Sequence, residues 1–430
     1  MTKLIEYTAE FTLQAAEDSI SFDVKSTEEQ AISQFSIDFL RVFPNVLNIE
    51  NRTINSLTNN SEDIQNNFKT FTAQYPNIPK LNAIEAFLRR LEIGENFYVI
   101  PSRLLSQAQT ISIINYLNAQ REGLEYEELN HQTNELFGKF LESYQISTFG
   151  DSRRTIGEKK REEKQCRFCG KWYPDVSFEK KAHAISEALG NKTVVLTEEC
   201  DNCNWRFSQT IEPDLVAYFA MYRTMYGIKG KGGEKEFKGK NFKFFKGENL
   251  ELHFISEEDK VEKSQTGMPE VIKLDSGRKI KMQNIYRTLV KFVLSVIEKE
   301  EIPNFERTIE WINGEREINL LPKIAVFTFY DKLPEQPTIT VHKRKDDNTE
   351  YPYMVGEFHF IFMKYIFIIP FSNKDNHTFR EEYEYQKFWK KFKHLDLLSD
   401  RATFMDFSND NEKTFIIKLN FEFNQKRDAQ

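Results

Sequence analysis

Two short stretches govern how the middle of the chain folds: CRFC at residues 166–169 and CDNC at residues 200–203. They contain all four cysteines of the 430-residue sequence, as two Cys-x-x-Cys knuckles about thirty residues apart. Each knuckle can span one edge of a tetrahedron, so the two together supply the four thiolates that a structural zinc ion takes. A redox dithiol is the competing interpretation, but redox motifs normally use one Cys-x-x-Cys after a strand. The predicted zinc ligands are Cys166, Cys169, Cys200 and Cys203, which leave no open position for catalysis.

The segment between the knuckles carries polar residues that a zinc ribbon does not need. It reads AHAISEALGN over residues 182–191, so one of only seven histidines, His183, is followed by the acid Glu187 and by Asn191. The second knuckle runs directly into Asn204. A histidine titrates near neutral pH, so this block can carry chemistry that a structural zinc ion alone does not supply. The alternative is a packed or hydrogen-bonded histidine inside a zinc ribbon.

The order of knuckle, histidine block, second knuckle and Cys-Asn ending resembles the HNH endonuclease family, specifically its zinc-bound members with a ββα-metal core. The resemblance covers roughly residues 160–235 and is carried by HAISEALG at residues 183–190 and by Asn204 after Cys203. It implies hydrolysis of a phosphodiester bond assisted by one divalent metal, Mg²⁺ or Mn²⁺. The resemblance makes His183 the general base that deprotonates water.

Two asparagines also match positions with roles in this family. Asn204 corresponds to the residue on the helix after the second knuckle that usually binds the catalytic metal. Asn191 is the candidate for the asparagine that holds the histidine in orientation. For Asn204 the alternative is a structural role, since asparagine is also a good helix-capping residue.

The chain departs from the family pattern at two positions. Many relatives have an acidic metal ligand where this chain has Ala182, and proline is usual where it has Ser186. The metal is therefore expected to take another oxygen donor, with Glu187 and Asp201 as the candidates, and otherwise the site is weak or inactive. Both acids have a solvent-facing role as the alternative.

A basic, glycine-rich stretch follows the second knuckle. Residues 227–246 hold seven lysines against two glutamates, with four phenylalanines among them. The lysines are not followed by Ser or Thr at the spacing of a phosphate-binding Walker motif. A flexible basic loop can nevertheless bind a nucleic-acid backbone without reading its sequence, so Lys229 and Lys231 are predicted phosphate contacts. A solvated linker is the alternative.

The overall composition predicts a multi-domain protein that does not enter a membrane. The length exceeds that of one small domain, and 38 phenylalanines can supply large cores. The formal charge of −7 argues against a surface that is basic throughout, but not against basic segments. Charges at Lys3 and Glu6 come too early for a signal-peptide core. The most apolar stretch, residues 351–371, contains Glu357 and Lys364, so we expect no membrane span and a cytoplasmic location.

Hydrophobic periodicity predicts an α+β fold. The expected regions are a mixed α/β, helix-rich accessory or regulatory region at 1–152, the small zinc-bound ββα-metal (HNH) module at 153–235, and a β-rich accessory domain with a few helices at 236–430. Residues 48–67 are rich in Asn, Ser and Thr and are expected to form a loop or an irregular connection. Residues 271–281 are expected to form two strands that turn at residues 275–277.

The leading hypothesis is a metal-dependent endonuclease that acts on DNA, with flanking regions that regulate or target cutting. RNA would need the same chemistry and stays open as a substrate, as do a regulatory protein partner and a homo-oligomer. A role in bacterial antiviral defence or restriction is expected by analogy only, because modules of this kind often occur in such systems. The alternative from another class is a non-catalytic zinc-ribbon protein that binds nucleic acid or a protein partner.

Overall fold

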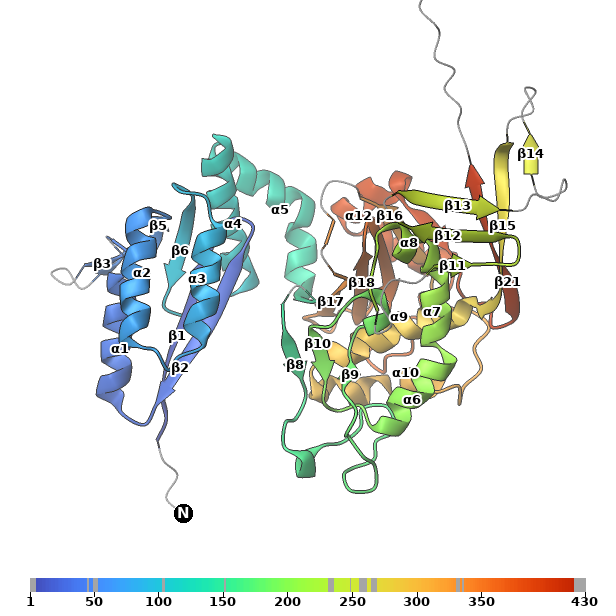
Figure 1. Cartoon of the computed structure of the whole chain (residues 1–430), viewed down its shortest axis with the longest axis horizontal. Helices are drawn as coiled ribbons and strands as arrows, with labels where there is room; N and C mark the ends of the chain where they lie inside the picture. Colours follow the sequence, from blue (N-terminus) through green and yellow to red (C-terminus); the bar gives the residue numbers. More distant parts are fainter. Residues whose placement is uncertain are drawn as a thin grey trace, which may run out of the picture. The chain divides into compact units, whose positions relative to one another are not determined.

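The chain forms two compact units, residues 1–141 and 142–430, in which helices are combined with mainly antiparallel sheets (Figure 1). The predicted α+β class is therefore confirmed. The structure is a computed structural model. It describes residues 5–44, 46–48, 53–102, 105–150, 152–230, 236–247, 249–254, 261–263, 269–329, 333–334 and 336–420.

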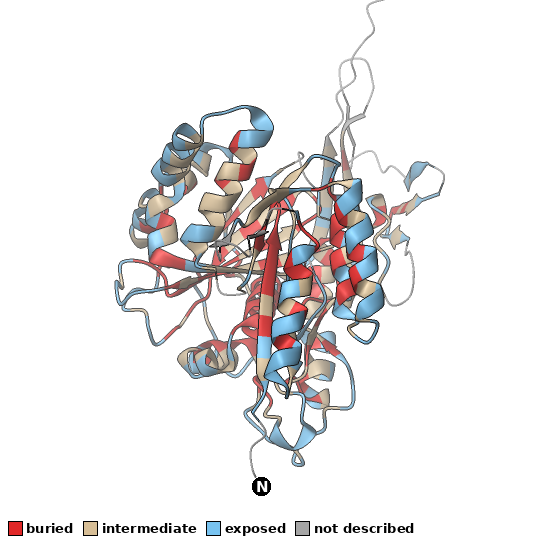
Figure 2. Cartoon of the chain, turned by 90° about the vertical axis from the view of Figure 1, so that its left-hand side faces the viewer, coloured by how far each residue is buried: buried red, intermediate tan, exposed pale blue. Residues whose placement is uncertain are grey.

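The first unit contains a four-stranded antiparallel sheet covered by amphipathic helices. The strands follow the order β2-β1-β6-β5, namely Ser19–Ser26, Tyr7–Gln14, Asn96–Ile100 and Leu57–Asn59. The helices are α1 (Glu29–Arg41), α2 (Glu62–Gln74), α3 (Lys80–Arg90), α4 (Gln107–Glu122) and α5 (Tyr126–Ser143), the last of which ends at the start of the second unit. Buried and exposed residues alternate at helical spacing along α1, α2 and α3 (Figure 2). Phenylalanines such as Phe11, Phe39 and Phe71 dominate the core between helices and sheet.

The expectation of a loop at residues 48–67 is wrong. Strand β3 (Leu47–Asn48) pairs with β4 (Thr53–Ile54), and β5 and the start of α2 follow before residue 67. Ser61 caps α2, because its side-chain oxygen accepts a hydrogen bond of 3.2 Å from the backbone N–H of Ile64. Part of the polar run is thus a helix N-cap, which is a position that favours serine and asparagine as strongly as loops do.

The second unit is built around a six-stranded antiparallel sheet and one buried helix. In spatial order the strands are β20 (Thr403–Met405), β16 (Ile324–Thr328), β19 (Met363–Ile368), β18 (Met354–Phe360), β17 (Thr338–Arg344) and β7 (Tyr144–Phe149). Helix α9 (Met282–Val296) contacts β17 and β18 on one side, and α7 (Glu212–Tyr218) and α10 (Glu306–Ile312) elsewhere. Every residue from Gln283 to Val296 is buried, so α9 is the central helix of this unit.

The segment with the two knuckles forms a small ββα unit beside α9. Strands β9 (Ala182–His183) and β10 (Val194–Leu196) are antiparallel, β8 (Arg154–Ile156) joins β10 in parallel, and α6 (Asp201–Thr210) follows. Its buried side chains, such as Phe207, belong to the same hydrophobic core as Leu289 of α9 and Phe358 of β18. Residues on both sides of position 235 therefore fold as one compact unit, within which the division at 153–235 and 236–430 stays a prediction.

Two smaller sheets complete the second unit. They are β11-β12-β13 (Phe237–Lys238, Phe242–Lys246, Leu250–Phe254) and β14-β15-β21 (Val261–Lys263, Pro269–Lys281, Glu412–Asn420). The expected turn at residues 275–277 is wrong, because β15 continues through it and pairs with β21 on both sides of a register shift between Asp275 and Lys279. The Asp-Ser-Gly sequence makes a bulge here, which needs the same positive φ, 67° at Gly277, as a tight turn does.

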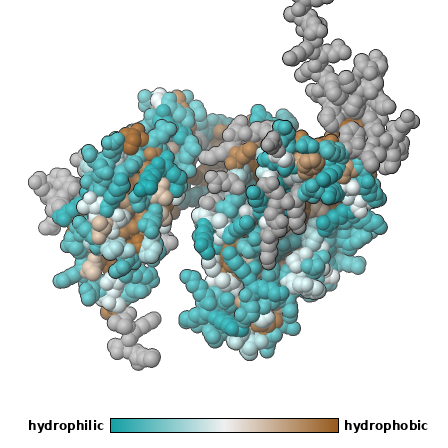
Figure 3. Space-filling model, in the orientation of Figure 1, coloured by the Kyte–Doolittle hydropathy of each residue, from teal (hydrophilic) through white to brown (hydrophobic). Residues whose placement is uncertain are grey.

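The face of the molecule drawn in Figure 3 is predominantly hydrophilic, with apolar residues scattered among hydrophilic ones. Among the helices that the structure describes, none is long and apolar enough to cross a membrane.

Candidate active site

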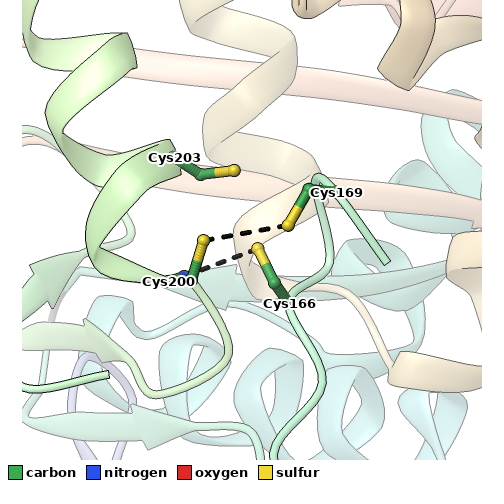
Figure 4. A group of neighbouring side chains, drawn as sticks. All are labelled: Cys166, Cys169, Cys200 and Cys203. Atoms are coloured by element: carbon green, nitrogen blue, oxygen red, sulfur yellow. Dashed lines mark hydrogen bonds between the residues drawn. The ribbon is translucent and has the colours of Figure 1, made fainter. Parts of the chain in front are cut away.

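The four cysteine sulfurs lie within 4.8 Å of one another (Figure 4). Cys166 and Cys169 come from the turn before β9, and Cys200 and Cys203 from the start of α6. The sulfurs of Cys169 and Cys200 are 3.8 Å apart, which matches the edge of about 3.8 Å that a tetrahedron with zinc–sulfur bonds of about 2.3 Å would have. A disulfide would need about 2.0 Å. The donor set therefore fits a structural zinc ion.

The four cysteine side chains lie so close together that hydrogen bonds among them shift their pKa values in opposite directions. Hydrogen bonding with Cys166 lowers the pKa of Cys169 and lowers that of Cys200 to about 6. Hydrogen bonds within the cluster raise the pKa of Cys166 and of Cys203, whose thiol forms then act as donors. A divalent cation would lower the pKa of all four groups, because it stabilises each of them as a thiolate.

A buried ion pair ties the first knuckle to the central helix. Arg167 donates from Nε to Glu198 Oε2 at 2.9 Å, and both side chains are almost fully buried. Its Nη1 donates to the carbonyl oxygens of Leu294 and Ile297, at 3.2 and 2.6 Å, at the C-terminal end of α9. A guanidinium at this end satisfies free carbonyls and complements the helix dipole. The cysteine cluster is thus fixed to the core of the second unit.

His183 lies on β9, opposite Val195 of β10, with only 14% of its side chain exposed. Its Nδ1 is 3.8 Å from Oε2 of Glu187, which lies four residues later at the start of the 3₁₀ helix η2 (Glu187–Leu189). Burial lowers the pKa of His183, and the charge of Glu187 opposes this shift only in part. The imidazole is therefore neutral at pH 7 and can accept a proton, while its partial exposure keeps it reachable.

Asn191 supports the hairpin that carries the histidine. Its side chain is fully buried, and Oδ1 accepts hydrogen bonds from the backbone N–H groups of Thr193 and Val194 at 3.2 and 3.1 Å. Nδ2 donates to the carbonyl oxygen of Pro337 at 3.0 Å. These bonds fix the turn that leads into β10, the strand that pairs with His183. The structure thus gives Asn191 a route to orient the histidine through the backbone.

Asp201 and Asn204 both lie on α6 but differ in their surroundings. The carboxylate of Asp201 accepts hydrogen bonds from the backbone N–H groups of Glu179 and Lys180, at 3.1 and 2.8 Å, and so holds the loop before β9. Burial alone would raise the pKa of Asp201, but these hydrogen bonds and one from Ser177 outweigh it and lower the pKa. Asn204 is the fourth residue of the helix, whose N-cap is Cys200, so Asn204 is not the capping residue.

The residue before His183, which is acidic in many members of the family that the sequence resembles, is a buried alanine in this chain. Ala182 is 1% exposed and lies opposite Leu196 in the small sheet. Of the two acids expected to replace it, Glu187 faces His183 and Asp201 is engaged by the backbone. Among the described residues, the cysteine cluster is the sole group of three or more His, Cys, Asp or Glu donors. Among the described ion pairs, the one carboxylate that faces the His183 imidazole is that of Glu187, while the charge of Glu212 acts on the histidine from further away.

A buried lysine beneath the hairpin was missed by the sequence analysis. Lys291 of α9 places Nζ 3.4 Å from the carbonyl oxygen of His183 and 3.1 Å from carboxylate oxygens of both Glu199 and Glu212. Burial raises the pKa of Glu199 to about 7. Burial would lower the pKa of Lys291, but the two acids outweigh it and raise the pKa, so the ammonium keeps its charge. A lysine within an otherwise apolar helical run was the available signal.

Replacement of Lys291 by methionine should destabilise the second unit by about 3–5 kcal/mol, because it leaves the buried carboxyl group of Glu199 and the partly buried one of Glu212 without their cation. Equilibrium unfolding in urea measures the change, and Lys279→Met, at an exposed position of β15, is the matched control. If both variants unfold at the same urea concentration, the ion triad does not support the hairpin.

The basic stretch after α8 (Ala220–Met225) passes directly over the histidine block. A Cβ added to Gly190 would lie 2.9 Å from Ile228 Cγ2, and one added to Gly230 would lie 3.3 Å from Ala188 Cα. Lys229, in the same segment, is exposed, and Lys231 lies outside the described residues. The neighbouring phenylalanines at 242 and 244 are buried in a small core, so they are not free to stack on bases.

Comparison with known proteins identifies the same segment. Residues 166–220 match the family model described as HNH endonuclease. The match begins at the first zinc ligand and extends through His183, Asn191 and Asn204 into α8. No curated protein and no solved structure matches the chain.

Proposed function

We propose that the HNH endonuclease domain of this chain, residues 166–220, hydrolyses phosphodiester bonds in DNA and that His183 activates the attacking water. The observation that carries this proposal is the setting of His183. It lies on a ββα unit closed by four cysteine sulfurs, is 14% exposed, and has a pKa lowered by burial. A neutral, reachable imidazole can take the proton of water at pH 7.

In the proposed reaction the water oxygen attacks phosphorus while its proton passes to the imidazole of His183. The bond from phosphorus to the leaving oxygen breaks, and the histidine becomes an imidazolium. Glu187, 3.8 Å from Nδ1, stabilises this cation. Asn191 and Lys291 act before the reaction, since their bonds to the backbone hold the hairpin in place.

A divalent metal, Mg²⁺ or Mn²⁺, would supply charge stabilisation at the phosphate and at the leaving oxygen. Magnesium commonly takes one or two carboxylates and completes its shell with water and substrate phosphate. The carboxylate of Glu187 beside His183 fits that demand and would hold the ion. The amide oxygen of Asn204 is the second ligand that the family resemblance suggests. Asp201 is the weaker candidate, because backbone N–H groups occupy its carboxylate.

One observation favours a binding module over an enzyme, namely the closed, acid-free position at Ala182. Cleavage of supercoiled plasmid by the zinc-loaded full chain with Mg²⁺ or Mn²⁺ tests the proposal. A protein that binds DNA or RNA but cuts neither with either ion would be a zinc-ribbon binding module.

A cytoplasmic location is part of the proposal, because a reducing compartment keeps the four zinc-binding thiols reduced. A role in bacterial defence or restriction rests on the family resemblance alone.

The cleavage rate should fall as the pH decreases through the pKa of His183, which burial holds below its ordinary value of 6.5. The charge of Glu187 raises this pKa, so Glu187→Gln should move the acid limb of the profile to lower pH. The sign follows because a neutral amide no longer stabilises the imidazolium, and the base form then persists at lower pH. Profiles of kcat/KM at saturating Mg²⁺ measure the shift, with exposed Glu317→Gln as the control. An acid limb that moves to higher pH would contradict the pairing.

A further inference from the structure

Arg223, on α8 next to the histidine block, is a half-buried cation for which the described residues supply no acidic partner. Its Nε is buried without a hydrogen-bond acceptor, and burial lowers the pKa of its guanidinium with no carboxylate to oppose the shift. The most buried arginines in the described part of the chain pair with acids, namely Arg167 with Glu198, Arg287 with Asp410 and Arg344 with Asp375. Arg206, which is partly buried like Arg223, donates to the side-chain oxygen of Asn313. A buried cation without an anion costs stability, so its retention suggests an anionic ligand.

The guanidinium borders a cavity that is rich in positive charge. Two adjoining hollows of about 500 and 230 Å³ share Arg223, Thr224 and Ile228 in their walls. Further cations enter from neighbouring strands: Lys238 on β11, Lys246 on β12 and Arg278 on β15.

One acid also borders the cavity. The carboxylate of Glu236 is already shared between Lys238 and Lys243, at 2.7 and 2.9 Å. This acid does not pair with Arg223 and does not balance the remaining cations, so the cavity as a whole favours an anion.

The cavity lies beside the residues proposed to act on the phosphodiester. A Cβ added to Gly230 would lie 3.5 Å from Arg223 Nη2 and 3.3 Å from Ala188 Cα, so Gly230 is flanked by both. Ala188 directly follows Glu187, the acid that faces His183. Because each strand of DNA carries a phosphate every 3.4 Å or so along its axis, a strand bound at His183 has further phosphates within reach of this cavity.

We propose that Arg223 binds a backbone phosphate of the same nucleic-acid strand that His183 cuts, and so positions that strand. The inference deepens the proposed function and rests on it. A guanidinium can hold two phosphate oxygens with parallel hydrogen bonds, which a lysine cannot do. Arg278 and Lys246 add charge to the cavity from exposed positions. Arg223 is therefore a positioning residue, since its contact lies away from the bond that breaks.

Binding and cutting are measured separately, with the full chain. Fluorescence anisotropy of a labelled 20-base-pair DNA, in EDTA and in the His183→Ala background, reports binding where no cleavage occurs. Arg223→Gln should weaken binding about tenfold at low salt and reduce the slope of log Kd against log salt by about 0.9, the loss expected for one phosphate contact. Arg223→Lys should recover only part of the affinity. The matched control is Arg401→Gln, at an exposed position of the same unit.

Binding by Arg223→Gln that equals binding by Arg401→Gln would overturn the inference, whatever the cleavage assay shows. Thermal denaturation with inorganic phosphate distinguishes a second source of the anion. If Arg223→Gln removes stabilisation by phosphate yet leaves DNA binding unchanged, the cavity serves a small anion and the proposal is wrong. If the wild type cuts no DNA but Arg223→Gln still weakens DNA binding, the proposed nuclease activity is wrong and the proposed contact between Arg223 and a phosphate stands.

Discussion

Replacement of His183 by alanine should lower the single-turnover rate of plasmid cleavage by about 10²- to 10⁴-fold, the usual contribution of a general base. The imidazole has no partner nearer than Glu187 at 3.8 Å among its described ion pairs, so its removal breaks no strong bond that supports the hairpin. The hairpin is held instead by Asn191 and Lys291 through the backbone. The variant should therefore keep its fold, its zinc and its affinity for DNA.

The measurement uses enzyme in excess over supercoiled plasmid, so that product release does not mask the chemical step. His377→Ala is the matched control, because that histidine is about half exposed and pairs with Glu384 outside the ββα unit. Metal content and thermal denaturation of both variants show whether the fold is intact. Cleavage that survives in His183→Ala at the wild-type rate would remove His183 as the base.

The zinc ligands and the ββα order could be predicted from sequence because they depend on local spacing. Two cysteines three residues apart can reach one ion almost regardless of the rest of the fold. The structure brings all four sulfurs together and places β9, β10 and α6 in the expected order. For His183 and Asn204 the family pattern supplied the positions, and the structure adds their burial and neighbours.

The support of the site could not be predicted, because it comes from residues distant in sequence. Lys291 lies 108 positions after His183 and meets it only because α9 packs under the hairpin. A hydrophobic pattern can indicate a helix in this segment, but it does not state which polar group a buried lysine will meet. Asp201 shows the same limit, since a carboxylate suited to a metal binds the backbone of a loop twenty residues earlier.

The two errors in the fold have a common physical origin. Ser61 was assigned to a loop and caps α2, and residues 275–277 were assigned to a turn and form a bulge within β15. Serine and asparagine satisfy backbone groups, and glycine permits positive φ, in loops, helix N-caps, turns and bulges alike. Their presence therefore marks an irregular backbone, and the neighbouring strand or helix decides which irregularity forms.

Substitution of Cys200 by serine should abolish zinc binding and unfold the ββα unit. Cys200 is fully buried, caps α6, and lies in the same core as Phe207 and Leu289. Structural zinc in small peptides contributes about 10–16 kcal/mol to folding. That is comparable with the whole stability of a domain, about 5–15 kcal/mol, so the core around α9 cannot compensate fully for its loss.

Zinc per chain, measured by mass spectrometry of the metal, should be one in the wild type and near zero in Cys200→Ser. Hydrogen exchange should show lost protection at residues 152–230 and retained protection at residues 5–44, because the first unit has its own hydrophobic core. Ser208→Ala, at an exposed position of α6, is the control for helix damage alone. EDTA should stop cleavage before it removes zinc, because four thiolates, three of them buried, release zinc slowly. A catalytic metal held by one carboxylate and an amide exchanges faster. Folded wild-type protein purified without zinc would show instead that the cysteines support the fold as thiols.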